Sequence, residues 1–299
     1  MRCDSGYPKV SVIIPCYNRR NFIAETVESV LRQTWPNIEL IVVDDGSTDG
    51  SREILESFGS KLQLMEHPGR ANRGQSAAIN LGIEACTGEY VAILDSDDLF
   101  VTQKIEKQVT FLIDHPEIGL VYANGNSIDV RGNVLYKFYD EDHSEPSISA
   151  RILLDCYFLI PNNSLIRKSV FASSGLFDED LRAAQDHDMA IRISEVARIA
   201  YIPDCLFYYR RHKDSISFRN VKTRWQNGYR ILWKACRRHR YPLKIILGRL
   251  AVLNFRMAQC CLEEKQYVKA TVYLLAAGLT DPLRSIRVLL GIESVSSHH

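Results

Sequence analysis

The first 125 residues alternate short apolar runs with longer segments of helical periodicity. Runs rich in β-branched residues predict strands at residues 10–14, 38–43, 62–66, 90–94 and 119–123. The segments between them predict helices at residues 22–33, 51–58, 75–86 and 101–115. This alternation indicates an α/β fold, with a mostly parallel sheet flanked by helices. In such sheets ligands bind outside the carboxyl ends of the strands.

The pattern changes in the second half of the chain. Residues 124–161 are less regular, with a hairpin predicted at 128–135, turning at Arg131-Gly132-Asn133, and a polar loop at 140–146. A further helix is predicted to open at Gln185. Beyond residue 217 the chain becomes helical and basic. We therefore predict a main domain at residues 8–217 and a basic helical extension at residues 218–299.

The overall composition is ordinary, but the charge is unevenly distributed along the chain. The formal net charge is +1, but residues 215–262 contain 11 Lys or Arg and no Asp or Glu, which leaves about −10 for the remainder. The eight cysteines lack metal-type spacing, so we expect reduced structural thiols. The N-terminus shows no apolar leader, and no stretch of about 18 uninterrupted apolar residues occurs. These features predict a cytoplasmic protein.

Acidic residues follow two of the predicted strands. Asp44-Asp45 ends the second strand, and Asp95-Ser96-Asp97-Asp98 follows the fourth. Carboxylates at strand ends can cap turns and helices, or they can bind Mg²⁺ or Mn²⁺ and, through the metal, a phosphorylated ligand. No G-x-G-x-x-G motif follows a strand, and no G-x-x-x-x-G-K-[ST] motif occurs. Dinucleotide dehydrogenases and P-loop enzymes are therefore disfavoured.

Five motifs in order carry a resemblance to a known family. They are VSVIIPCYN at residues 10–18, VDDGSTDG at 43–50, NRGQSAAIN at 72–80, GEYVAILDSDD at 88–98 and QDHD at 185–188. Over about residues 8–215 the chain resembles the family 2 glycosyltransferases, which are inverting enzymes with a GT-A type, Rossmann-like fold. The set is specific because five motifs occur in the same order, although each alone would be weak.

The resemblance implies a site for a nucleotide-sugar donor. It assigns donor binding to Pro15, Tyr17, Asp45, Arg73 and Asp95. It assigns the divalent metal, Mn²⁺ or Mg²⁺, to Asp97, Asp95 and His212. Asp44 is then expected to hold its turn, and Asp98 is either a helix cap or a ligand.

One position departs from the family pattern. Relatives often carry an arginine immediately before the last asparagine of the third motif, where this chain has Ile79. Arg70 or Arg73 is the candidate to supply the missing cation.

Transfer with inversion needs a base that deprotonates the acceptor hydroxyl. The resemblance points to Asp186, with Gln185 in place of the usual glutamate, and Asp188 is the alternative base. Asp188 and Asn163 are also candidates for the acceptor side of the site. A polar turn accounts for the segment around Asn163 almost as well.

The chain is thus predicted to be a metal-dependent inverting glycosyltransferase that moves a sugar, preferably from a UDP-sugar, to a hydroxyl of a glycan or lipid-linked acceptor. Polysaccharide assembly is the setting that the resemblance implies. A nucleotidyltransferase and a non-catalytic nucleotide-sugar-binding scaffold are the alternatives. The basic extension, with Trp225, Trp233 and Arg237–Arg240, is either a peripheral contact with the inner face of the membrane or a solvated helical face. Without base-stacking motifs, its charge does not favour nucleic acid.

Overall fold

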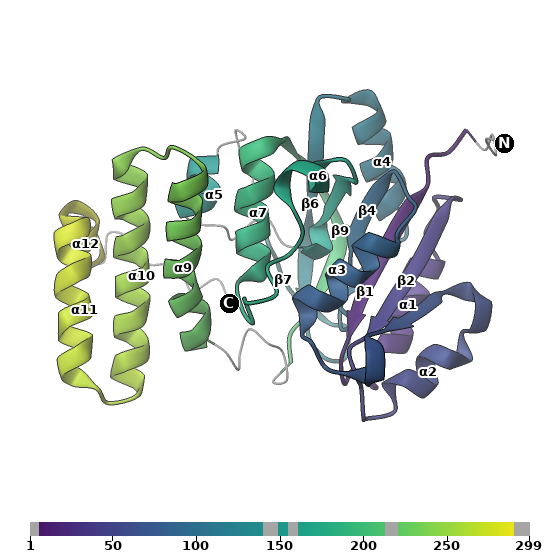
Figure 1. Ribbon diagram of the computed structural model, residues 1–299, viewed down its shortest axis with the longest axis horizontal. Helices are drawn as coiled ribbons and strands as arrows, with labels where there is room; N and C mark the ends of the chain where they lie inside the picture. The colour runs from purple at the N-terminus through teal and green to yellow at the C-terminus, as the bar shows by residue number, and fades with distance from the viewer. Residues whose placement is uncertain (1–5, 140–148, 155–160, 213–220, 290–299) are drawn as a thin grey trace. The chain divides into compact units, whose positions relative to one another are not determined.

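The computed structural model of the chain describes residues 6–139, 149–154, 161–212 and 221–289 (Figure 1). The chain divides into two compact units. The first comprises Met1–Ser147, Leu159–Asp180 and Arg192–His212, and the second Ile148–Phe158, Leu181–Ile191 and Lys213–His299. The predicted boundary at residues 217 and 218 lies outside the described residues. The second unit also takes in two segments that precede that boundary.

The first unit is built on one sheet. Its strands are β1 (Val10–Cys16), β2 (Ile38–Asp44), β3 (Gln63–Glu66), β4 (Tyr90–Ile93), β5 (Leu99–Phe100), β6 (Ile118–Ile128), β7 (Val134–Lys137), β8 (Ser164–Arg167) and β9 (Arg198–Arg210). The order across the sheet is β3-β2-β1-β4-β8-β6-β9-β5, and β7 pairs with β6. Strands β1 to β4 pair in parallel, whereas β8, β7 and β5 each pair antiparallel to a neighbour. The N-terminal half is therefore the parallel sheet that the sequence predicts, and the remainder is mixed.

Helices cover both faces of this sheet (Figure 1). Those that lie wholly in the first unit are α1 (Ile23–Leu31), α2 (Ser51–Ser57), α3 (Gln75–Ala85), α4 (Lys104–Asp114) and α6 (Val170–Ser174). Alternate residues of β1, including Val10 and Val12, are buried in one core cluster with side chains from α1, α2 and α4. Ile13 faces the other way, towards α3. A Cβ on Gly82 of α3 would lie 2.5 Å from Ile13 Cγ2, so only glycine allows this close approach.

The predicted hairpin is confirmed. β6 pairs with β7 across the turn at residues 129–133, and Gly132 adopts the positive φ of 87° that favours glycine. Asp129 Oδ1 accepts hydrogen bonds from the backbone N–H groups of Arg131 and Asn133, at 2.8 and 2.9 Å. The predicted polar loop at residues 140–146 lies outside the described residues.

The longest strand, β9, was not predicted. Its sequence contains Pro203-Asp204, and a proline inside an apolar run argues against a regular strand. The structure accommodates the interruption with register shifts in the β6–β9 pairing around Asn124, where the ladder passes from Ile202 to Cys205. The pairing with β6 therefore continues on both sides of the proline.

The second unit is helical. It contains α5 (Ser149–Leu154), the first turns of α7 (Gln185–Val196), α9 (Val221–Arg238), α10 (Leu243–Glu263), α11 (Tyr267–Thr280) and α12 (Pro282–Leu289), as the sequence predicts beyond residue 217. Among the described residues, α10 alone is long and apolar enough to cross a membrane, but half of its apolar window is buried, and the core helix of a soluble protein meets the same criteria. Arg249, in the middle of α10, donates a hydrogen bond to the Leu154 carbonyl at 3.1 Å.

Lys104, at the start of α4, gives the first unit a testable pH dependence. Its side chain is fully buried; Nζ donates to Gln108 Oε1 at 2.6 Å and to the Ser164 carbonyl at 3.2 Å, and lies 4.1 Å from the centre of the Phe100 ring. Burial lowers the pKa of Lys104 well below its ordinary value. Near neutral pH the unfolded chain therefore binds the proton more strongly than the folded chain does, so raising the pH towards about 10.4 stabilises the fold.

Comparison with Lys104→Met tests this. As pH rises from 7 to 9.5, the free energy of unfolding of the wild type should increase relative to the variant, by at most about 1.4 kcal/mol per pH unit. Urea denaturation at both pH values measures the difference. Parallel stability curves for the two proteins would show that Lys104 keeps an ordinary pKa in the fold.

Candidate active site

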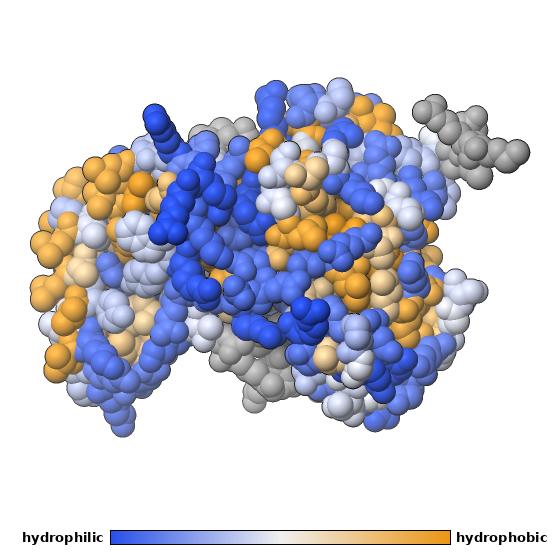
Figure 2. All heavy atoms as spheres, in the orientation of Figure 1, coloured by the Kyte–Doolittle hydropathy of each residue, from blue (hydrophilic) through white to orange (hydrophobic). Residues whose placement is uncertain are grey.

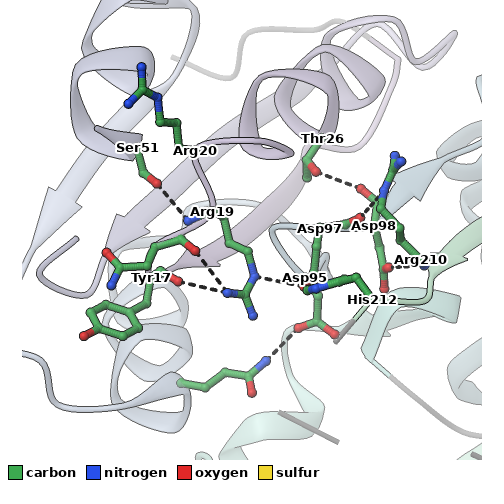
Figure 3. Close-up of polar contacts among 12 residues, drawn as sticks. Tyr17, Arg19, Arg20, Thr26, Ser51, Asp95, Asp97, Asp98, Arg210 and His212 are labelled. Carbon is green, nitrogen blue, oxygen red and sulfur yellow. Dashed lines mark hydrogen bonds and ion pairs between the residues drawn. The ribbon is translucent and has the colours of Figure 1, made fainter. Parts of the chain in front are cut away.

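An acid cluster follows β4, at the carboxyl end of the parallel strands. The segment Asp95–Asp98 turns back on itself, and the Asp98 N–H donates to the Asp95 carbonyl at 3.1 Å. Figure 3 shows the three carboxylates together with side chains from other parts of the first unit. Each of the three acids has different partners, and those partners give the carboxylates different roles.

Asp97 lies between two cationic or potentially cationic groups. Arg19 Nε lies 2.9 Å and His212 Nε2 2.8 Å from the same carboxylate oxygen, Oδ2 (Figure 3). Arg19 is itself held in place, because its Nη1 donates to the carbonyls of Tyr17 and Asn18 at 3.3 and 3.1 Å. Burial alone would raise the pKa of the Asp97 carboxyl, but His212 and Arg19 outweigh it, and the pKa lies below its ordinary value. Asp97 is therefore ionised.

Asp98 is buried and performs a structural role. Its Oδ1 accepts the Arg210 N–H at 2.7 Å, its Oδ2 is bonded to the Asn162 amide, and its carbonyl accepts from Thr26 Oγ1 at 2.9 Å. Burial and the charges of Asp97 and Asp95 raise the pKa of the Asp98 carboxyl well above its ordinary value. Asp98 thus ties the turn after β4 to α1 and β9.

Arg210 and Asn162 lie in segments that the resemblance singled out, residues 208–212 and 162–164, but the residues predicted from those segments were His212 and Asn163. Arg210 Nε donates to the Asp97 carbonyl at 2.9 Å, and Arg210 Nη2 donates to Glu25 Oε2 at 2.7 Å. The Asn162 amide accepts the Asp95 N–H at 2.7 Å through Oδ1 and donates to Asp95 Oδ2 at 3.1 Å through Nδ2. These two side chains fix the shape of the Asp95–Asp98 turn.

Asp95 and Asn163, two of the predicted site residues, differ in their burial and in their contacts. Asp95 is half-buried, and its Oδ1 also accepts from Gln75 Nε2 at 2.6 Å. Asn163, the residue that the sequence suggested, is fully buried, and its Oδ1 accepts from Ser164 Oγ at 3.0 Å. Of this asparagine pair, Asn162 is therefore the one whose amide bonds to Asp95 and Asp98. Because Asn162 and Asn163 are adjacent and identical in type, the sequence pattern does not distinguish which of them reaches the acids.

The second acid pair lies at the end of β2. Asp44 is buried and accepts the Ser47 N–H at 3.2 Å, so the prediction that it holds the turn is confirmed. Asp45 accepts the backbone N–H groups of Arg73 and Gly74, one on each carboxylate oxygen, both at 2.8 Å. These N–H groups immediately precede α3, where a helix favours negative charge. Asp45, which is 2% exposed, therefore fixes the loop before α3.

The other predicted donor-side residues differ in how far they are exposed. Pro15 is buried within β1, whereas the ring of Tyr17, just beyond that strand, is 46% exposed (Figure 3). Arg73 is exposed and lies 3.4 Å from Glu179. Arg70 is half exposed and donates to the Ser47 carbonyl at 3.4 Å. Ile79, at the position where relatives carry arginine, is fully buried.

A cavity of about 420 Å³ lies elsewhere in the first unit, lined by residues that include Gly88, Arg167 and Lys168. Arg167 and Lys168 donate to backbone carbonyls there, Arg167 to that of Ile118 at 2.9 Å and Lys168 to that of Cys86. A second cavity, of about 360 Å³, is lined by Gly46, Ser47, Thr48, Gly50, Glu53 and Arg70, and so lies directly beyond Asp45. The second cavity is the one next to the candidate site.

The predicted base belongs to the second unit. Asp186 and Asp188 lie in the first turn of α7. Asp186 is half-buried, and its Oδ1 accepts the His187 N–H at 2.8 Å, whereas Asp188 is 1% exposed. Burial raises the pKa of the Asp186 carboxyl above its ordinary value, against the opposing effects of the His187 N–H and Arg224. Of the two acids, Asp186 keeps more surface for a ligand.

His187, between these acids, is a neutral structural residue. Burial, reinforced by the charge of Arg249, lowers its pKa to about 3. Its Nε2 lies 2.9 Å from the Ile152 carbonyl, and its Nδ1 lies 3.2 Å from Arg249 Nη2. Because the carbonyl can only accept and the guanidinium can only donate, the proton is on Nε2. His187 thus anchors the start of α7 to α5 and α10.

The fold is that of a GT-A type glycosyltransferase, an enzyme that uses a nucleotide-sugar donor. A family model described as glycosyl transferase family 2 matches residues 11–175. The chain belongs to this family.

Known proteins agree with this assignment. An uncharacterized glycosyltransferase of Rickettsia typhi is 30% identical over 286 residues, which cover 94% of this chain and 87% of the relative. The crystal structure of S. aureus TarS, residues 1–349, is similar with a TM-score of 0.68 and 22% identity, covering 93% of this chain and 82% of that chain. TarS has also been solved with UDP-GlcNAc. The mannosyltransferase PcManGT from Pyrobaculum calidifontis, in complex with GDP-Man and Mn²⁺, is similar with a TM-score of 0.61 and 22% identity, covering 95% of this chain and 79% of that chain.

Proposed function

We propose that this glycosyltransferase moves a sugar from a UDP-sugar to an acceptor hydroxyl with inversion at the anomeric carbon, and that it requires a divalent metal. The observation that carries the proposal is the acid cluster, in which ionised Asp97 lies against His212 and Arg19 beyond the parallel strands. The UDP-GlcNAc complex of TarS supports the choice of UDP among nucleotides.

The donor would bind along the ends of β1, β2 and β4. The exposed ring of Tyr17 offers a flat apolar surface for the base. Asp45 and the Pro15 carbonyl are the candidate hydrogen-bond acceptors for the base, since Pro15 has no N–H. Asp95 would meet the ribose, and Arg73 the diphosphate.

The cluster fits a divalent cation, Mn²⁺ or Mg²⁺. Asp95 and Asp97 would hold it with carboxylate oxygens and His212 with an imidazole nitrogen, a set that Mn²⁺ accepts. The Asp97 carboxylate is already paired with a positive group, the guanidinium of Arg19. The buried Nδ1 of His212 makes no hydrogen bond within the described part of the chain. When bound, the cation would neutralise the charge that develops on the departing nucleotide diphosphate.

Asp186 is the proposed base. The acceptor oxygen bonds to the anomeric carbon while its proton passes to the Asp186 carboxylate. The bond from that carbon to the diphosphate oxygen breaks, and its electron pair leaves with the nucleotide diphosphate. One displacement of this kind inverts the anomeric centre. The raised pKa of Asp186 brings it closer to the working pH, which makes the carboxylate a better base.

The acceptor is proposed to be a glycan or lipid-linked hydroxyl, in polysaccharide or lipid-linked glycan assembly at the inner face of the membrane. This rests on the family resemblance together with the basic helices of the second unit. Asn163 and Asp188 remain proposals for the acceptor side, although both are buried in the described structure.

A thermal-shift screen of nucleotide sugars, with and without Mn²⁺, tests the donor and metal together. A UDP-sugar should raise the midpoint of unfolding more when Mn²⁺ is present, because a ligand at 100 times its Kd stabilises the folded state by about 2.7 kcal/mol. GDP-sugars serve as the matched comparison. Release of pyrophosphate from UTP and a sugar 1-phosphate, with no release of UDP from a UDP-sugar and an acceptor, would contradict glycosyl transfer and indicate a nucleotidyltransferase.

A further inference from the structure

Helix α11 presents an apolar stripe away from its own unit. Its buried residues are Ala270 and Ala277, and it packs against α10. Its most exposed aliphatic side chains are Val268, Val272, Leu275 and Leu279, with exposed fractions of 80%, 60%, 64% and 85%. Spacings of four, three and four residues place them on one face of the helix. Apolar atoms gather over this helix in Figure 2.

Helix α12 extends the stripe. Asp281, between the two helices, accepts the Arg284 N–H at 3.1 Å and so fixes the start of α12. Leu283 and Ile286, three residues apart, are 72% and 52% exposed. Single exposed apolar residues are normal, but a contiguous run of this kind marks an interaction site. We call these six side chains, Val268, Val272, Leu275, Leu279, Leu283 and Ile286, the α11–α12 face.

The charges on the same two helices favour a lipid surface over a second copy of this chain as the partner. α11 and α12 contain Lys269, Arg284 and Arg287 but no Asp or Glu. Two copies meeting through the α11–α12 face would bring like charges together, because residues 267–289 hold these three cations against one acid, Asp281. A surface of anionic lipid headgroups complements these cations, while its hydrocarbon layer accepts the apolar side chains.

We propose that the α11–α12 face docks this protein on a bilayer that contains anionic lipid. The two helices lie in the plane of the interface, with the apolar face in the boundary between headgroups and acyl chains and the cations at headgroup level. In the first part of the basic region, Trp225 is half-buried, and its ring lies 4.6 Å from the Arg224 guanidinium and 5.3 Å from that of Arg256, whereas Trp233 on the same helix is 59% exposed. Docking through the α11–α12 face is a binding event and does not require turnover of donor or acceptor.

Flotation of the full chain with vesicles tests the apolar contribution. The wild type should float with vesicles of phosphatidylcholine and phosphatidylglycerol, and less with phosphatidylcholine alone. Leu275→Asp and Leu279→Asp should each weaken binding roughly tenfold to hundredfold, the range for losing a buried leucine. Both side chains are exposed, so folding should be unaffected. The matched control is Leu135→Asp, which alters an equally apolar side chain, 52% exposed on β7, and should leave binding unchanged.

Charge reversal tests the electrostatic contribution. Lys269→Glu with Arg287→Glu should reduce binding to the anionic vesicles by more than tenfold, since each cation near such a surface contributes about fivefold. The control is Arg237→Glu with Arg240→Glu, at exposed positions at and just beyond the end of α9, where a much smaller loss is expected.

Three outcomes would overturn the proposal. The wild type fails to float with anionic vesicles, the aspartate variants float as well as the wild type, or Leu279→Asp dissociates a dimer in size-exclusion light scattering while vesicle binding is absent. UDP-sugar binding is measured on the same samples. Loss of vesicle binding with intact donor binding separates failure of this surface from failure of the proposed donor site.

Discussion

Replacing Asp97 with asparagine is expected to remove the effect of Mn²⁺ on donor binding and to lower the transfer rate at least about a thousandfold. The asparagine keeps the size of the side chain but loses the charge that holds Arg19 and His212 and that would hold the cation. A thousandfold loss corresponds to about 4 kcal/mol of transition-state stabilisation, which is the scale of a lost metal contact. Titration calorimetry with UDP, with and without Mn²⁺, measures the binding effect, and product formation measures the rate.

The control is Asp204→Asn. Asp204 is also paired with a cation, Lys107, but on the exposed part of β9. This variant should bind donor and turn over normally. If Asp97→Asn bound UDP as tightly as the wild type in Mn²⁺, the metal assignment would be wrong. If it lost affinity equally with and without Mn²⁺, Asp97 would act by positioning Arg19 and His212.

Asp186→Asn is expected to stop transfer while sparing the donor. The amide cannot accept the proton of the acceptor hydroxyl, and loss of a general base lowers turnover by about a hundredfold to ten-thousandfold. The Kd for UDP-sugar should stay within about twofold, because the proposed donor contacts lie in the first unit. Turnover of a suitable acceptor and donor affinity are the two measurements.

Asp188→Asn makes the same chemical change two residues away. Near-normal turnover in Asp186→Asn together with loss of turnover in Asp188→Asn would transfer the role of base to Asp188. The pH profile adds a second readout. The base works only when ionised, so the rate of the wild type should fall as pH falls through the raised pKa of Asp186, above the ordinary aspartate value of about 3.9.

Much of the parallel half of the fold could be predicted from local pattern. The β1 and β2 runs are buried on both sides, so they appear as continuous apolar segments, and the helix between them has a regular apolar stripe. The observed helix, Ile23–Leu31, lies within the predicted residues 22–33. The mixed half of the sheet was harder to predict, because β5 has two residues and β9 contains a proline. Such strands are stabilised by their partners in the sheet.

The candidate site shows the same division. The ordered motifs pointed to Asp45, Asp95 and Asp97 through the family resemblance, and acids that follow parallel strands lie at one edge of the sheet. They did not point to Arg19 or Asn162. Arg19 lies 78 residues from Asp97 in sequence, and Asn162 lies 67 residues from Asp95. Nothing in its local sequence distinguishes Arg19 from other polar residues, and the Asn162–Ser164 segment was singled out without a means of choosing Asn162 over Asn163.

The sequence by itself determined the family, the α/β sheet, the acids at its edge and the basic helices that follow, since these depend on period, spacing and motif order. The tertiary structure decided how the similar acids differ. Asp97 is ionised because Arg19 and His212 reach it, Asp98 is buried and bonded on both oxygens, and Asp45 is bonded to the loop before α3. It also decided that the outer face of α11 is exposed. Charge state and exposure depend on which distant residues come within a few ångströms, and only the folded chain sets those distances.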